Sequence, residues 1–166
     1  MKLPSLLVTI AKTQIGKHET GGANKGSDLR AYFESDNYKP NSTDDGYPWC
    51  ASFVCWCVLK AMQAGGVDET PTFRRPKTPS AFGLATWSRD QDNSTLTKDW
   101  PGSDIKAGDI VIYQFSHTGI AVTDAVNGMF EAIEGNTNQA GSREGTHVMK
   151  KTRPVSSVRN RIRFTV

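Results

Sequence analysis

The stretch PWCASFVCWCVLKAMQAGG, residues 48–66, carries the strongest secondary-structure signal in the chain. It predicts a helix from Pro48 to about Ala64, because proline suits the first helical turn and Gly65-Gly66 ends the pattern. Apolar side chains recur on nearly every side of this helix, so we expect it to be buried rather than to lie on a surface. Cys50 would then stand at or near the helix N-terminus.

Weaker patterns predict three shorter helices around this one. The spacing of apolar residues favours a helix over residues 4–15, and a cap at Ser27 favours a second helix that reaches Phe33. Thr78-Pro79 opens a third helix, which runs through Trp87. Residues 90–98 are mostly polar and predict a loop.

The second half of the chain changes to the pattern of β-strands. Runs rich in β-branched and aromatic residues predict strands over residues 110–115, 117–126, 129–133, 147–152 and 158–166. Asn127-Gly128 is a strong signal for a tight hairpin turn. Helices followed by an antiparallel sheet of about five or six strands indicate an α+β fold.

The length and composition limit the class of protein. A chain of 166 residues suits one domain, residues 1–166, with a single core. No apolar run approaches the about 20 residues of a membrane-spanning helix, which argues against an integral membrane protein. Residues 1–10 are interrupted by Pro4, Ser5 and Thr9, and no small-residue cleavage site follows them. We therefore expect a protein that is made in the cytoplasm without a signal peptide.

The three cysteines all lie between Cys50 and Cys57, and such a cluster does not make a disulfide framework. Unpaired backbone N–H groups and the helix dipole stabilise a thiolate at a helix N-terminus, which makes Cys50 a candidate nucleophile. The alternative is that Cys50 is one more small buried residue, like Cys55 and Cys57.

A nucleophilic cysteine needs a base, and His117 is the best placed histidine in the sequence. It begins a predicted strand in the motif Ser116-His117-Thr118-Gly119, where a side chain can reach a cleft without entering the core. A lone histidine at such a position is more often an ordinary surface residue. A third polar group beside the ring favours the catalytic interpretation.

The expected hairpin supplies two such groups. If Asn127-Gly128 forms a two-residue turn, opposed residues have numbers that sum to 127 + 128 = 255. This register places Asn136 diagonally beside His117 and Glu134 one ladder step further away, all on one face of the sheet. The alternative is that residues 134–138 are simply a polar turn.

Several motifs together resemble the CHAP family, the cysteine, histidine-dependent amidohydrolases/peptidases. They occur in this order: Pro48-Trp49-Cys50-Ala51, Gly108-Asp109, His117-Thr118-Gly119-Ile120-Ala121-Val122 and Glu134-Gly135-Asn136-Thr137. Upstream, Gln14-Ile15-Gly16, Glu19, Asn24, Gly26 and Tyr32 are similar to the leading segment of many members. The resemblance implies a papain-like α+β fold and cleavage of an amide bond in bacterial peptidoglycan through a thioester.

The resemblance also implies roles for particular residues. The family's nucleophile corresponds to Cys50, its base to His117, and its third and fourth polar positions to Glu134 and Asn136. We expect Glu134 to be the principal partner of His117, because a carboxylate stabilises an imidazolium whereas an amide only orients it.

Residues next to the nucleophile and upstream of it bear on substrate and metal binding. We expect Tyr47 and Trp49 to bind the substrate.

Some family members hold calcium through spaced acidic residues just before the cysteine, but Asp44-Asp45-Gly46 lacks that spacing. The sequence has no His-Glu-x-x-His motif, and its cysteines do not match zinc spacing. We therefore expect no metal and no cofactor.

The C-terminal segment is basic. Arg159, Arg161 and Arg163 alternate with other residues in the last predicted strand, which predicts one exposed stripe of arginines. Such a stripe is either a solvated strand face or a surface that binds the anionic cell wall. We do not expect nucleic-acid binding, because seventeen acidic residues keep the net charge at only +3.

Three interpretations of function remain open at this point. The first is a phage endolysin that acts at the cell wall or periplasm after release, as a monomer with peptidoglycan as its partner. The second is an interbacterial amidase toxin with the same chemistry, which would have an immunity protein. The third is a catalytically inactive module that binds the cell wall, because a fold by itself does not prove function.

Overall fold

The computed structural model describes residues 1–37, 46–99 and 104–166. In these residues, helices come first and a six-stranded antiparallel sheet follows, so the predicted α+β class is confirmed. The helices are α1 (Leu3–Thr13), α2 (Ser27–Ser35), α3 (Cys50–Gly65) and α4 (Ala81–Arg89), with a short 3-10 helix at Val155–Ser157. The strands are β1 (Leu96–Asp99), β2 (Ile110–Tyr113), β3 (His117–Ala121), β4 (Met129–Thr137), β5 (His147–Pro154) and β6 (Val158–Phe164).

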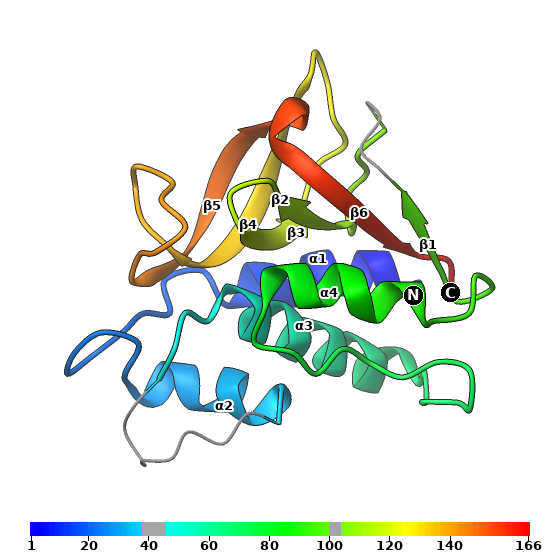
Figure 1. Ribbon diagram of the computed structural model, residues 1–166, viewed down its shortest axis with the longest axis horizontal. Helices are drawn as coiled ribbons and strands as arrows, with labels where there is room; N and C mark the ends of the chain where they lie inside the picture. The colour runs from blue at the N-terminus through cyan, green and yellow to red at the C-terminus, as the bar shows by residue number, and fades with distance from the viewer. Residues whose placement is uncertain (38–45, 100–103) are drawn as a thin grey trace.

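Helix α3 is the centre of the molecule, as its apolar sequence predicts. It starts at Cys50, two residues after Pro48, and ends where Gly66 adopts a left-handed conformation and donates to the Met62 carbonyl. Figure 1 shows α1, α3 and α4 side by side beneath the sheet, with α2 further out beside α3. The main core lies between these helices and the sheet, and it includes Leu7, Val54, Val58, Leu84, Ile112, Ile120 and Ile133. None of the helices in the described ranges combines the length and apolarity that crossing a membrane requires.

The strand order is β1-β6-β2-β3-β4-β5, and every pair of neighbours is antiparallel. β1 corrects a prediction, because residues 96–99 form a strand where the polar composition predicted a loop. The strand exists because β6 offers it a partner: Leu96 pairs with Phe164, and both side chains are buried. Pairing and burial at two positions outweigh the polar composition of this short segment.

The register of the β3–β4 hairpin differs from the prediction. Val126 and Met129 flank the expected Asn127-Gly128 turn, but further in Ala121 pairs with Ala132, so the residue numbers sum to 253 instead of 255. Between these two pairs, the segment that follows β3 is therefore two residues longer than the segment of β4 that faces it. The Thr123 hydroxyl accepts a hydrogen bond from the Glu131 N–H at 3.0 Å within this irregular segment. Because side chains alternate with a period of two, the shift keeps every residue on its predicted face.

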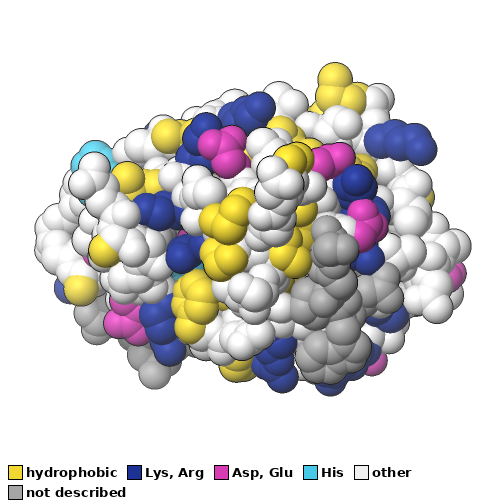
Figure 2. Space-filling model, turned by 90° about the horizontal axis from the view of Figure 1, so that it is seen from above, with side chains coloured by type: hydrophobic (Ala, Val, Ile, Leu, Met, Phe, Trp, Pro, Cys, Tyr) yellow, Lys and Arg dark blue, Asp and Glu magenta, His cyan; other side chains and the backbone are white. Residues whose placement is uncertain are grey.

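The predicted exposed stripe of arginines on β6 is wrong. Arg161 is 7% exposed, and Arg163 makes two hydrogen bonds to the buried carboxylate of Asp109 at 2.7 and 2.8 Å. Arg159 lies over the ring of Phe82 at 4.2 Å. The reason is the position of β6, which lies inside the sheet between β1 and β2 and has helix α4 against it. On the face seen in Figure 2, Lys and Arg side chains are scattered among acidic and hydrophobic ones and form no single stripe.

Candidate active site

Three elements bring the predicted site residues together. Cys50 is the first residue of α3, His117 is the first residue of β3, and Glu134 and Asn136 lie near the end of β4. Helix α3 packs directly on β3 and β4, which sets its N-terminus against that end of the hairpin. Cys50 is 5% exposed and the other three residues are 1% exposed or less. The arrangement is thus a nearly closed polar cluster at the edge of the core.

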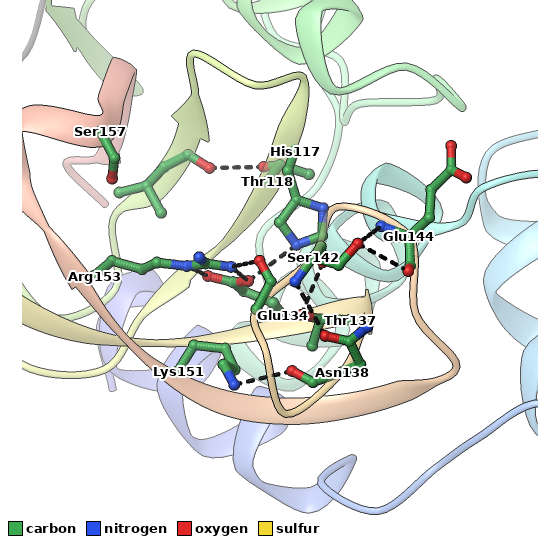
Figure 3. Close-up of polar contacts among 12 residues, drawn as sticks. His117, Thr118, Glu134, Thr137, Asn138, Ser142, Glu144, Lys151, Arg153 and Ser157 are labelled. Atoms are coloured by element: carbon green, nitrogen blue, oxygen red, sulfur yellow. Dashed lines mark hydrogen bonds and ion pairs between the residues drawn. The ribbon is translucent and has the colours of Figure 1, made fainter.

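His117 and Glu134 are joined directly. His117 Nε2–H donates to Glu134 Oε2 at 3.0 Å, and both side chains are completely buried (Figure 3). The corrected register explains the contact, because it moves Glu134 two residues closer along β4 and sets it beside Gly119. Asn136 does not take this position, although the predicted register had favoured it.

The second ring nitrogen of His117 is not engaged by Glu134. Nδ1 is buried and makes no hydrogen bond to another described residue. Burial disfavours the imidazolium, but the hydrogen bonds and charges of Cys50 and Glu134 outweigh burial and raise the pKa of His117 to about 9. Cys50 and Glu134 therefore both favour the protonated form of the ring.

Glu134 remains ionised in spite of its burial. Burial alone would raise the pKa of this carboxyl group, but hydrogen bonds from Arg153 and His117 hold the pKa below its ordinary value. Arg153 Nε donates to Oε1 at 2.8 Å and Arg153 Nη2 donates to Oε2 at 2.6 Å. A carboxylate that accepts hydrogen bonds from a guanidinium stays ionised and can stabilise an imidazolium on its other side.

Asn136 occupies a distortion of β4. The pairing of β4 with β5 shifts between Glu134 and Thr137, and Asn136 has a left-handed backbone with φ 55°. Asparagine tolerates this conformation better than most residues, and such bulges redirect side chains. Its Nδ2 is buried without a hydrogen-bond partner among the described residues, and no described hydrogen bond joins it to His117. The structure therefore brings Asn136 into the cluster but does not give it the contact that Glu134 makes.

The two residues expected to bind substrate are placed differently. Trp49 is 0% exposed, stacks on Tyr32 at 5.7 Å, and donates its indole N–H to Glu19 at 2.9 Å. These contacts hold the Trp49 side chain next to the start of α3, and its expected role in substrate binding stays a prediction. Tyr47 is half-buried, and its hydroxyl donates to Asp36 at 2.6 Å.

The sequence analysis missed part of this cluster. Arg153 counted only as one of several basic C-terminal residues, and Tyr113 and Phe115 counted only as strand formers. In the structure the rings of Tyr113, Phe115 and His117 lie nearly parallel, with centroids 5.2 to 6.0 Å apart. Tyr113 pairs directly with His117 across the turn between β2 and β3, so a tight hairpin at residues 114–116 could have indicated that these two rings lie side by side. Nothing in the sequence pairs residue 153 with residue 134.

No metal centre appears in the part of the chain that the structure describes. Within residues 1–37, 46–99 and 104–166, no group of three or more His, Cys, Asp or Glu side chains is arranged to hold a metal ion. The acidic pair Asp44-Asp45, which bears on the expectation about calcium, lies outside the described residues.

Comparisons with known proteins agree with this architecture. A family model for the CHAP domain matches residues 42–136, more than half of the chain, so the protein belongs to the CHAP-domain family. A solved structure, titled as the crystal structure of a wild type endolysin LysIME-EF1, aligns with a TM-score of 0.55 and 20% sequence identity. The alignment covers 98% of this chain and 64% of that endolysin, so the chain spans somewhat less than two thirds of the endolysin's length. No curated protein matches the sequence.

Proposed function

We propose that this protein is a cysteine hydrolase that cleaves an amide bond in bacterial peptidoglycan. One observation carries the proposal: a buried His117–Glu134 hydrogen bond of 3.0 Å stands against the N-terminus of a helix that begins with Cys50. This is the order nucleophile, base and orienting carboxylate that covalent amide hydrolysis requires. Membership of the CHAP-domain family and a fold shared with a solved endolysin support the choice of substrate.

Each residue has a role in the proposed reaction. The Cys50 thiolate attacks the amide carbonyl carbon while the imidazolium of His117 stands ready as the acid. The C–N bond then breaks as His117 gives its proton to the departing amine, which leaves a thioester on Cys50. A water molecule attacks the thioester and gives a proton to His117, and the C–S bond breaks to release the acid and restore the thiolate–imidazolium pair.

Two further groups stabilise this sequence of steps. Glu134 stays ionised and holds Nε2 of His117, which leaves Nδ1 as the nitrogen that exchanges the proton with Cys50. The first N–H groups of a helix have no intrahelical acceptor, so the backbone N–H of Cys50 is the proposed donor to the oxyanion. We assign Asn136 a secondary role, because its buried Nδ2 points to no described partner while Glu134 makes the direct contact.

Of the possible biological settings, we favour a phage endolysin that acts at the bacterial cell wall as a monomer. The fold is shared with a solved endolysin, and the binding-module alternative gives no reason to maintain a buried Cys–His–Glu cluster. No observation favours the interbacterial toxin over the endolysin, and the toxin would require an immunity protein as a further partner.

The proposal is tested by turnover of purified peptidoglycan. The wild-type protein should clear a suspension of purified cell walls, and mass spectrometry of the products should show new amine and carboxyl ends at one type of amide bond. Cys50→Ala should abolish clearing, whereas Cys55→Ala is a matched control that removes a thiol from the same helix. Clearing by Cys50→Ala, or a wild-type protein that binds walls without releasing fragments, would contradict the proposal.

A further inference from the structure

Arg153 is the charged residue closest to the proposed catalytic cluster that no motif predicted. It lies on β5, where its backbone pairs with Phe130 of β4 rather than with Glu134. The side chain runs along the sheet to reach Glu134, as Figure 3 shows, and its donors Nε and Nη2 engage both carboxylate oxygens at 2.8 and 2.6 Å. Such a bidentate interaction fixes the plane of the carboxylate as well as its position.

Other contacts hold the guanidinium itself in place. Nη2 also donates to the Gly141 carbonyl at 3.0 Å, and the guanidinium carbon lies 5.2 Å from the ring centres of both Tyr113 and Phe115. The Arg153 side chain is only 12% exposed. The carbonyl and the two aromatic rings keep the guanidinium in one position, so it cannot move with Glu134 if the carboxylate rotates. The guanidinium therefore restricts the orientation of the carboxylate.

The two partners of Glu134 meet at one oxygen. Oε2 accepts from both Arg153 Nη2 and His117 Nε2, and Oε1 accepts from Arg153 Nε. If the carboxylate turned away from His117 it would break both contacts with Arg153. We propose that Arg153 is a positioning residue, which holds Glu134 against His117 Nε2 and thereby keeps Nδ1 turned toward Cys50.

This inference rests on the proposed function for its effect on catalysis, but its structural part can be tested without turnover. Arg153 is among the groups that lower the pKa of Glu134, so its removal should raise that pKa. In Arg153→Gln we expect the ¹³Cδ signal of Glu134 to titrate at a higher pH than in the wild type, because the guanidinium that stabilises the carboxylate is gone. In Arg153→Lys the charge remains, so the Glu134 signal should titrate close to its wild-type position.

The kinetic readout separates orientation from charge. With soluble peptidoglycan fragments, Arg153→Gln and Arg153→Lys should both lower kcat by about 10- to 100-fold, because neither can hold the carboxylate in a fixed plane. KM should stay within about twofold, because Arg153 acts through Glu134 rather than through the substrate. In a Glu134→Gln background, adding Arg153→Gln should lower kcat little further.

A matched control distinguishes positioning from support of the adjacent loop. Lys151 lies two residues earlier on β5 and anchors the same loop, donating to the carbonyls of Asn138 and Gln139 at 2.9 and 2.6 Å. Lys151→Gln should leave both the Glu134 titration and kcat close to wild type. Equal losses of kcat in Lys151→Gln and Arg153→Gln would overturn the inference.

The remaining outcomes also decide the question. An unchanged Glu134 titration in Arg153→Gln would overturn the inference even if activity fell. If Arg153→Gln unfolds because it leaves a buried charge unpaired, the double variant Arg153→Gln/Glu134→Gln removes both charges, and its kcat compared with that of Glu134→Gln alone still tests whether Arg153 acts through Glu134. If the wild-type protein does not cleave peptidoglycan, the proposed function fails, but the titrations still test the role of Arg153.

Discussion

The side chain of Glu134 fills the space that a side chain on Gly119 would need. A Cβ placed on Gly119 would lie 2.7 Å from Glu134 Cγ and 2.9 Å from the Ile133 carbonyl oxygen. The two residues are on neighbouring strands, and the missing side chain lets the carboxylate cross to His117. Gly119 therefore shapes the site by leaving room for Glu134, although it has no reactive group of its own.

We first predict that Gly119→Ala impairs the site and the fold together. The added methyl group must displace either Glu134 or the backbone of β4, which should lower the free energy of unfolding by about 1–3 kcal/mol. Displacement of Glu134 should also bring the pKa of His117 down toward its ordinary value, as measured by NMR. Gly65→Ala is the control, because Gly65 lies at the far end of α3, about 22 Å along the helix from Cys50. It should leave the His117 titration unchanged.

A second prediction concerns the three thiols. Burial raises the pKa of Cys55 to about 12 and holds that of Cys57 well above its ordinary value, so both should stay protonated and unreactive in the folded protein. Iodoacetamide should therefore label one site, Cys50, and activity should fall in step with that label. Peptide mapping by mass spectrometry would show this directly. Labelling of Cys55 or Cys57 at the same rate as Cys50 would contradict it, and unfolded protein should take up three labels.

Substitution of the two polar residues on β4 should have unequal effects. Glu134→Gln removes the charge that faces His117 Nε2, so we expect a lower His117 pKa and a fall in kcat of about 100-fold. Asn136→Ala should cost less activity, because no described hydrogen bond links Asn136 to the ring. NMR titration of His117 in both variants checks this prediction. A large loss of activity in Asn136→Ala together with an unchanged His117 pKa in Glu134→Gln would reverse the assignment.

The raised pKa of His117 also predicts how stability depends on pH. The folded protein holds this proton up to a pH of about 9, whereas an unfolded chain releases it near the ordinary histidine value of 6.5. A group with a raised pKa contributes its full stability below the unfolded value and loses it as the pH rises through the folded value. The free energy of unfolding should therefore decline between about pH 6.5 and pH 9.

Chemical denaturation at several pH values would measure this decline. The control is His117→Asn, which cannot titrate in this range and should show a smaller decline over the same interval. An equal decline in both proteins would mean that other groups cause it. The same deprotonation should reduce activity above about pH 9, because a neutral imidazole cannot protonate the departing amine.

The local features of this protein could be predicted well from its sequence. Helix α3, its start near Cys50, and the turn at Asn127-Gly128 depend on periodicity, caps and turn residues that lie close together in the chain. Cys50 and His117 stood out for the same reason, since each begins a predicted element. The expected hairpin and the alternation of side chains placed Glu134 and Asn136 on the face of His117, and the family motifs assigned roles to both.

Contacts between distant residues could be known only from the folded protein. The two extra residues before the hairpin turn, the pairing of Leu96 with Phe164 and the reach of Arg153 to Glu134 each join segments whose relative offset no local pattern specifies. A strand register is chosen by the sum of packing and hydrogen bonding across the whole sheet, and a shift of two residues leaves the polar and apolar pattern intact. The sequence alone therefore determined which residues share a face, and the tertiary structure decided that Glu134, rather than Asn136, contacts His117.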